Sequence, residues 1–272
     1  MLHLLGIEYS KVKNYTTFWV MLIIYAILVP LALYAISAIE LAPPGATTPL
    51  FSGSSLLEFP TIWNSVTYVA SFFNLLLGVL VILIVCNDFN YRTFKQNVID
   101  GLSKQQVIAS KFIFLTFLAV VVAIYTFILG LLFGFIYSDD INMFDEIYYL
   151  GIYFIQTIGY FTIAFLLAIL LKKPALSIII FVLAFWTKLL FLIVLDESIV
   201  QFLPVNLISD LTPWPLQWIT AMIKMNPDPD AQAQAMEEMS LMISTPTRSI
   251  IAVCYISIFV FISNLILRKT DL

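Results

Sequence analysis

The chain has very few charged residues for its length. Charged side chains make up 11% of its 272 residues, whereas soluble domains average about 25%. Hydrophobic residues make up 61%, and the mean hydropathy is +1.00. So few charges cannot cover the surface of a soluble globule of this size. The composition therefore excludes an ordinary soluble domain and indicates a membrane protein.

The sequence also lacks the residues of common catalytic and metal sites. His3 is the only histidine, which excludes a Ser-His-Asp site in the apolar segments and any histidine-rich metal site. No GxxxxGK[ST] phosphate loop occurs, so we do not expect this chain to bind ATP by itself. Cys86 and Cys254 fall near opposite faces of the membrane, and no disulfide is expected. We expect a chain without enzyme activity and without a metal.

Long apolar runs dominate the sequence. A bilayer core requires about 20 apolar residues in a helix, and uncharged runs of at least that length or close to it occur at 14–39, 59–87, 112–138, 147–171 and 249–267. A sixth run, 174–195, contains only Lys188. We predict an all-α polytopic membrane protein, with residues 1–272 forming a single transmembrane domain. Its six spans are expected at about 18–38, 66–86, 112–137, 148–171, 175–195 and 249–267.

The distribution of basic residues predicts the orientation. Six spans place both termini on one side, and that side carries ten of the thirteen basic residues: Lys11, Lys13, Arg92, Lys95, Lys104, Lys111, Lys172, Lys173, Arg268 and Lys269. Short loops rich in Lys and Arg stay in the cytoplasm. Both termini and the loop at 87–111 are therefore expected to be cytoplasmic. The net charge of −4 averages two opposite faces and gives no indication of nucleic acid binding.

The segment before the first span has helical periodicity. Apolar residues recur at Leu5, Tyr9, Val12 and Tyr15, while Glu8 and Lys11 can pair at i,i+3 on another side. This pattern favours a short helix lying in the inner membrane interface. An ordinary basic flank that obeys the orientation rule explains the same residues, and the sequence leaves both interpretations open.

The loop at 87–111 contains signals for two helices. Thr93–Ile99 can form two turns in which Phe94 and Val98 share a face, and Gly101 after Asp100 is typical of a helix end. Ser103 and Gln106 form the pattern of a capping box that begins the next helix. Such a short helix could bind a cytoplasmic partner, or the loop could be a solvated connector.

This loop resembles the cytoplasmic loop between spans two and three of ABC-2 type permeases, the membrane subunits of one class of ATP-binding-cassette transporters. Those loops have an acidic residue, a Gly-Thr pair, a Pro followed by a Ser and a basic residue, and a closing Lys. The matching positions here are Asp88, Arg92-Thr93, Gly101, Ser103-Lys104 and Lys111. Arg92 replaces the Gly and Gly101 replaces the Pro.

The resemblance implies a permease subunit in a bacterial plasma membrane, in contact with membrane lipid. Two permease copies, identical or related, would form the pathway and join separate ATPase subunits that bind ATP and magnesium, most often for export. Thr93–Ile99 would then be the coupling helix. Phe94 and Val98 are expected to insert into a groove of the ATPase, with Lys95 and Lys104 at its rim. Glu8 and Lys11 are further candidate contacts.

Two other functions are open to a polytopic membrane protein of this composition. A secondary transporter often has buried acids within its spans, and no predicted span here contains an acid. A non-transporting membrane scaffold for an assembly or motility machine is supported only by the absence of visible chemistry.

The segment 196–248, expected outside the membrane, shows two helix starts. Thr212-Pro213 would open a helix that carries Trp214, Trp218, Met222 and Lys224. Asp228-Pro229 would open another with Met236, Met239 and Ile243 on one stripe. In the family resembled, this region carries short outer helices that partly re-enter the membrane.

Two features inside the predicted spans invite a functional interpretation. Lys188 could reach the headgroups or pair with Asp196 or Glu197, which we favour over contact with substrate. Gly130 and Gly134 have the spacing that allows close approach of two helices.

Overall fold

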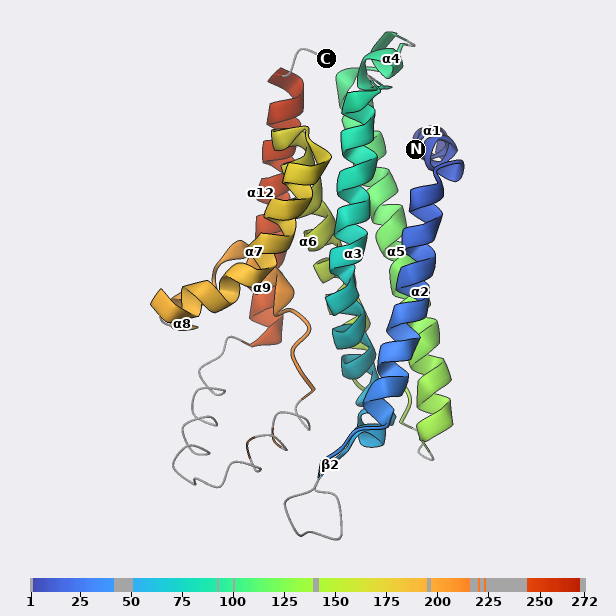
Figure 1. The fold of residues 1–272 in the computed structure, drawn as a ribbon, viewed down its shortest axis with the longest axis vertical. Coiled ribbons are helices and arrows are strands. Elements are labelled where there is room, and N and C mark those ends of the chain that lie inside the picture. Colours follow the sequence, from blue (N-terminus) through green and yellow to red (C-terminus); the bar gives the residue numbers. More distant parts are fainter. Residues whose placement is uncertain are drawn as a thin grey trace.

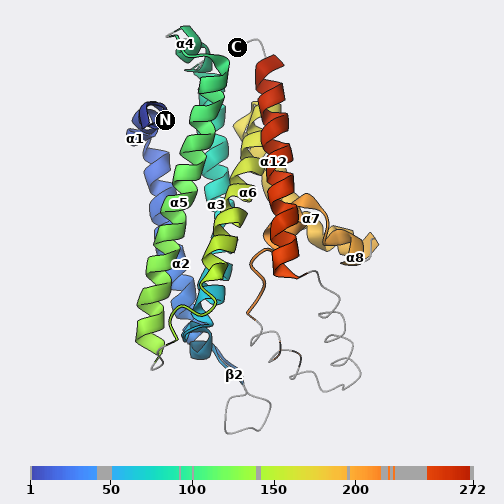
Figure 2. The same cartoon turned by 180° about the vertical axis from the view of Figure 1, so that it is seen from behind.

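The protein is a bundle of long helices that run along one common axis (Figures 1 and 2). The computed structural model describes residues 2–41, 51–91, 93–99, 101–138, 142–194, 197–215, 220, 223 and 244–269. Some helical residues within these ranges have no described side chain, among them Lys95, Val98 and Lys188. The predicted features at Trp218, Met222, Lys224 and residues 228–243 lie outside the described residues.

The long helices follow the predicted spans closely. They are α2 (Thr16–Ser37), α3 (Ile62–Asn90), α5 (Lys104–Tyr137), α6 (Tyr148–Leu171), α7 (Pro174–Val194) and α12 (Thr245–Lys269). The shorter ones are α1 (Leu2–Lys13), α4 (Thr93–Ile99), α8 (Glu197–Val200) and α9 (Pro204–Ser209), with a 3-10 turn at Gly53–Leu57. Strands β1 (Glu40–Leu41) and β2 (Phe51–Ser52) pair antiparallel beyond the end of α2, with Glu40 opposite Ser52.

Within the described residues, five helices are long and apolar enough to cross a membrane: α2, α3, α5, α6 and α12. Of α7, the stretch Pro174–Trp186 is apolar but shorter than a span, so six spans stay a prediction. The 34 residues of α5 extend about 51 Å, well beyond a bilayer core of about 30 Å. Helix α5 begins eight residues before its predicted span. These residues, 104–111, lie next to α4.

Helices α3 and α6 form the core of the bundle. In the most apolar stretch of each of these helices, 61% of the residues are buried, against 17% in the corresponding stretches of α2 and α12. The two central helices pack mainly on each other, and α2, α5 and α7 surround α3. Large apolar side chains of α2, α5 and α12 face outward, as expected where helices contact lipid. The core therefore lies along α3 and α6, and α2 and α12 are peripheral.

One end of the bundle brings together segments that are far apart in sequence. Helix α4, the start of α1 and the end of α12 all lie at this end, which we call the α4 end, and both views agree (Figures 1 and 2). Helix α1 is turned away from the axis of α2 instead of continuing it. The β1–β2 pair lies at the opposite end. The expected N-terminal helix is thus confirmed as a helix, adjoining the end that carries α4.

The segment after α7 folds back against α6. Ile208 of α9 packs over Gly159, where an added Cβ would lie 2.8 Å from the Ile208 Cγ2 atom. Gln156 donates a hydrogen bond to the Ser209 carbonyl oxygen at 2.9 Å and accepts one from the Thr212 hydroxyl at 2.9 Å. Short helices between α7 and α12 therefore exist at α8 and α9.

The predicted start of a helix at Thr212 is wrong, because Pro213–Pro215 is irregular, although Thr220 and Ile223 farther along the predicted helix are helical. The Thr212 hydroxyl that would cap the helix is engaged by Gln156. Pro215 has no N–H to offer such a cap, and Trp214, which precedes it, is disfavoured in the helical region.

Two glycines of α5 accommodate aromatic rings from α3 and from the segment just before it. A Cβ added at Gly130 would lie 2.7 Å from the Trp63 ring, and one at Gly134 would lie 2.3 Å from the Phe59 ring. The same arrangement recurs at Gly78, where Phe181 of α7 approaches an added Cβ to 2.3 Å. The glycine pair predicted for close helix packing thus serves to seat rings, which fixes the register of α3 against α5.

We predict that Gly78→Ala destabilises the protein by about 1–3 kcal/mol, because the fully buried Phe181 ring must move away from the new methyl group. Gly151→Ala in α6 is the matched control, since nothing lies within 4 Å of its added Cβ. Thermal unfolding in detergent is expected to show a lower Tm for Gly78→Ala only, with partial recovery when Phe181→Leu is added. Equal Tm values for the two alanine variants would contradict this packing.

Candidate functional site

The loop at the α4 end folds as its sequence signals predicted. Helix α4 spans Thr93–Ile99, and Gly101 has a φ of 100°, in the left-handed region. The Ser103 hydroxyl accepts a hydrogen bond from the Gln106 N–H at 3.2 Å, and the Gln106 side chain accepts one from the Ser103 N–H at 2.9 Å. The capping box is therefore confirmed, and it turns the chain sharply from α4 into α5.

Phe94 points from α4 toward the bundle. Its side chain is 2% exposed, its ring centroid lies 4.7 Å from that of Phe89, and the Lys111 Nζ atom lies 5.7 Å from its centroid. The expectation that Phe94 inserts into a partner's groove therefore requires a correction. In this structure Phe94 anchors α4 on α3 and α5, because a ring in those contacts has no free face for another protein.

Helix α4 exposes other residues. The Ile99 side chain is 83% exposed, and Gln96 is also exposed. Thr93 and Lys104, two of the predicted coupling residues, are half-buried. Tyr91, just before α4, is 78% exposed. Ile99 and Tyr91 are thus the large apolar side chains that α4 and the residue before it leave exposed.

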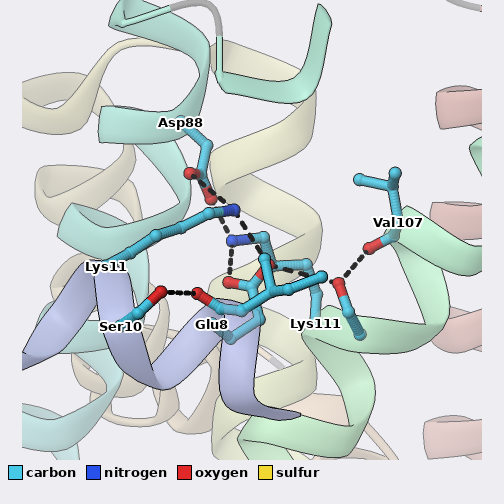
Figure 3. Close-up of polar contacts among 8 residues, drawn as sticks. Glu8, Ser10, Lys11, Asp88, Val107 and Lys111 are labelled. Carbon is cyan, nitrogen blue, oxygen red and sulfur yellow. Dashed lines mark hydrogen bonds and ion pairs between the residues drawn. The ribbon is translucent and has the colours of Figure 1, made fainter. Parts of the chain in front are cut away.

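Beneath α4 lies a buried cluster of charged residues from three helices. Glu8 of α1, Asp88 of α3 and Lys111 of α5 are 1%, 6% and 2% exposed, and Lys11 of α1 completes the set (Figure 3). The Lys111 ammonium group pairs with carboxylate oxygens of both Glu8 and Asp88. We call these four residues the ionic cluster.

Lys11 and Ser110 add further contacts to the ionic cluster. The Lys11 Nζ atom lies 3.0 Å from Glu8 Oε1 and 3.8 Å from Asp88 Oδ1. The Ser110 hydroxyl donates a hydrogen bond to Glu8 Oε1 at 3.2 Å. Two ammonium groups thus face two carboxylates, and the charges balance. Such balance is required because an unpaired charge in this setting is strongly destabilising.

The electrostatics of the ionic cluster favour the ionised form of Glu8. Burial alone raises the pKa of the Glu8 carboxyl, but Lys111 and Lys11 together outweigh that effect and hold the pKa below its ordinary value of 4.5. Glu8 is therefore a carboxylate at neutral pH, which is the form that binds both lysines.

The sequence did not indicate this arrangement. Glu8 and Lys11 were expected to pair, which is confirmed, and to touch a partner protein, whereas Glu8 is almost fully enclosed within the chain. Asp88 and Lys111 belonged to the loop pattern, but no role was assigned to them. Glu8 and Lys111 are 103 positions apart, and no helical period relates residues at that separation.

No group of three or more potential metal ligands occurs in the described part of the chain. Lys188 lies on α7, but its side chain is not among those described, so its predicted pairing stays a prediction. The ionic cluster joins α1, α3 and α5 through ion pairs.

Comparison with known protein families agrees with this geometry. A family profile described as ABC-2 family transporter protein matches residues 4–188, more than half of the chain. The chain belongs to the ABC-2 transporter family. No curated protein matches it significantly. The match includes every residue of the ionic cluster and all of α4. This ABC-2 protein is a multi-pass transporter permease, and its family membership confirms the resemblance carried by the loop.

We predict that Glu8→Gln lowers the stability of the permease by about 3 kcal/mol at pH 7, since Lys111 loses one of two buried partners. Because folding lowers the pKa of Glu8, its stabilising contribution is present above pH 4.5 and is lost as the pH falls through the lowered value. The difference in Tm between Glu8→Gln and the unmodified protein should therefore shrink as the pH is lowered below 4.5.

Asp145→Asn is the control, since Asp145 is an exposed carboxylate in the segment between α5 and α6, which joins these helices at the end opposite α4 (Figure 1). This variant should have the same Tm as the unmodified protein at pH 7 and at the lower pH values. A Tm difference for Glu8→Gln that does not shrink as the pH is lowered from 7 to well below 4.5 would show that ionised Glu8 does not stabilise the ionic cluster.

Proposed function

We propose that this chain is the permease subunit of an ABC exporter in a bacterial plasma membrane, powered by separate ATPase subunits. The chain contains no phosphate loop, so ATP and magnesium would bind to the partner. A second permease copy, identical or related, would complete the pathway. The lipid-facing apolar side chains of α2, α5 and α12 agree with this membrane setting.

The arrangement of charges supports a cytoplasmic α4 end. Lys11 and Lys172 contact Asp88 and Phe89 near the end of α3, and Lys104 and Arg268 lie at the start of α5 and the end of α12. These basic residues follow the rule that short cytoplasmic loops are rich in Lys and Arg. Both termini would then face the cytoplasm. Helix α1, turned away from α2, would lie in the inner interface, with Tyr9 45% exposed.

Helix α4 is the proposed contact for the ATPase. Its exposed Ile99 and Gln96, with Thr93, Lys95, Val98 and Lys104, would form the docking surface. Lys11, whose side chain is 24% exposed, could also reach the ATPase. Phe94 would act from beneath, as the anchor that keeps α4 attached to α3 and α5.

The single observation that carries this proposal is the set of contacts made by Lys111. Its ammonium group lies over the Phe94 ring and pairs with Glu8 and Asp88. A force on α4 would pass through Phe94 to Lys111 and from there to α1 and α3. Because a buried charge cannot leave its partners without a large cost in free energy, these segments would move together.

We predict that Ile99→Glu reduces recovery of the ATPase with the tagged permease by about tenfold or more, because an exposed apolar side chain that the ATPase would cover becomes charged. The ATPase is identified first, by mass spectrometry of proteins that copurify with the unmodified chain in detergent. Phe144→Glu is the matched control, since Phe144 is an apolar side chain, 63% exposed, in the segment between α5 and α6.

The control should recover the ATPase at the unmodified level. The proposal fails if the unmodified chain brings down no protein with a phosphate loop. The α4 surface is incorrectly assigned if an ATPase is recovered in equal amounts by the unmodified chain and by Ile99→Glu.

A further inference from the structure

Helix α2 contains a proline in its middle. Pro30 lies within Thr16–Ser37, has no backbone N–H, and so cannot bond to the carbonyl of Ala26 four residues earlier. In a membrane no water is present to bind the freed oxygen. The Tyr125 hydroxyl of α5 donates a hydrogen bond to this oxygen at 2.5 Å. The one carbonyl that Pro30 leaves open is thus bound by a neighbouring helix.

A second contact fixes α2 at the same level. The hydroxyl oxygens of Tyr25 and Tyr153 lie 2.8 Å apart, and Tyr153 donates to Asn74 Oδ1 at 3.0 Å. Tyr25 and Tyr125 are also ring neighbours, with centroids 6.1 Å apart. The part of α2 just before Pro30 is therefore attached to α3, α5 and α6 through polar groups.

Elsewhere α2 packs on α3 and on the 3-10 turn at Gly53–Leu57. Its buried side chains are Phe18, Tyr25, Val29 and Leu33, which form one narrow stripe, while its outer face is exposed. Near its end the Tyr137 hydroxyl donates to Ser37 Oγ at 3.0 Å. A peripheral helix with a proline joint and a narrow contact stripe can bend without disturbing the core formed by α3 and α6.

We propose that Pro30 and Tyr125 form a latched hinge in α2. Pro30 provides the joint, and the Tyr125 hydroxyl holds it in one conformation by binding the Ala26 carbonyl. Releasing that bond lets the segment after Pro30 tilt away from α5 while the segment before it stays attached at Tyr25. The hinge rests on the fold of this chain and does not depend on an ATPase partner.

A double-mutant cycle tests the hinge. Tyr125→Phe keeps the ring but removes the donor, so the Ala26 carbonyl loses its partner, and the Tm should fall by about 2–4 °C. Pro30→Ala restores an N–H that can bond to Ala26 within α2. In that background Tyr125→Phe should cost less than half as much. An equal loss in both backgrounds would overturn the proposal.

Tyr137→Phe is the matched control, because it removes a tyrosine hydroxyl of α5 that bonds to a side chain of α2. Its effect on the Tm should be the same with Pro30 and with Ala at that position. The proposal would be overturned if the decrease in Tm caused by Tyr137→Phe also disappeared in the Pro30→Ala background. The energetic coupling to Pro30 would then not be specific to Tyr125.

The motion itself is measured with spin labels at Val20 and Tyr34, two exposed positions of α2 on either side of Pro30. They are about 21 Å apart along the helix, and Cys86 and Cys254 are replaced first. Tyr125→Phe should broaden the distance distribution, and adding Pro30→Ala should narrow it again. An unchanged distribution in Tyr125→Phe would show that Tyr125 does not latch the hinge.

Discussion

The burial of Lys111 is the constraint on which the α4 end depends. An ammonium group that is 2% exposed must have anionic partners, and Lys111 finds them in Glu8 and Asp88, which come from two other helices. The first helix, the end of α3 and the start of α5 are thereby required to meet at one place. Helix α4 rests on the same lysine through Phe94. Under the proposed function, this is where a partner outside the membrane would be linked to the spans.

The rest of the bundle divides into a closely packed centre and a less buried periphery. Rings seated on Gly78, Gly130 and Gly134 lock α3 to α5 and α7, and α9 is held on α6 by Gly159 and Gln156. Close packing of this kind resists gradual deformation. Helix α2 differs, because it has a narrow buried stripe and a proline whose open carbonyl depends on one hydroxyl. Movement that starts at the ionic cluster would therefore meet least resistance along α2.

Local signals in the sequence were sufficient for much of the fold. Hydropathy located α6 at residues 148–171, and the capping box at Ser103 located the start of α5. The burial of Phe94 could not be read from α4, because in two turns the inward and outward faces look alike. The Glu8–Lys111 pair depends on tertiary contacts that no spacing encodes. The error at Thr212 was different in kind, since the Trp214-Pro215 sequence already disfavoured a helix there.

The central claim is that the ionic cluster makes α1 and the end of α3 one mechanical unit. It is tested most directly by the spin-label distance between Tyr9 of α1 and Tyr91 at the end of α3, two exposed positions on either side of the ionic cluster. The distance is measured in the complex with the proposed ATPase, with and without ATP. The account predicts one narrow distribution under both conditions and a broader one in Glu8→Gln. A mean distance that shifts when ATP binds to the unmodified complex would contradict it.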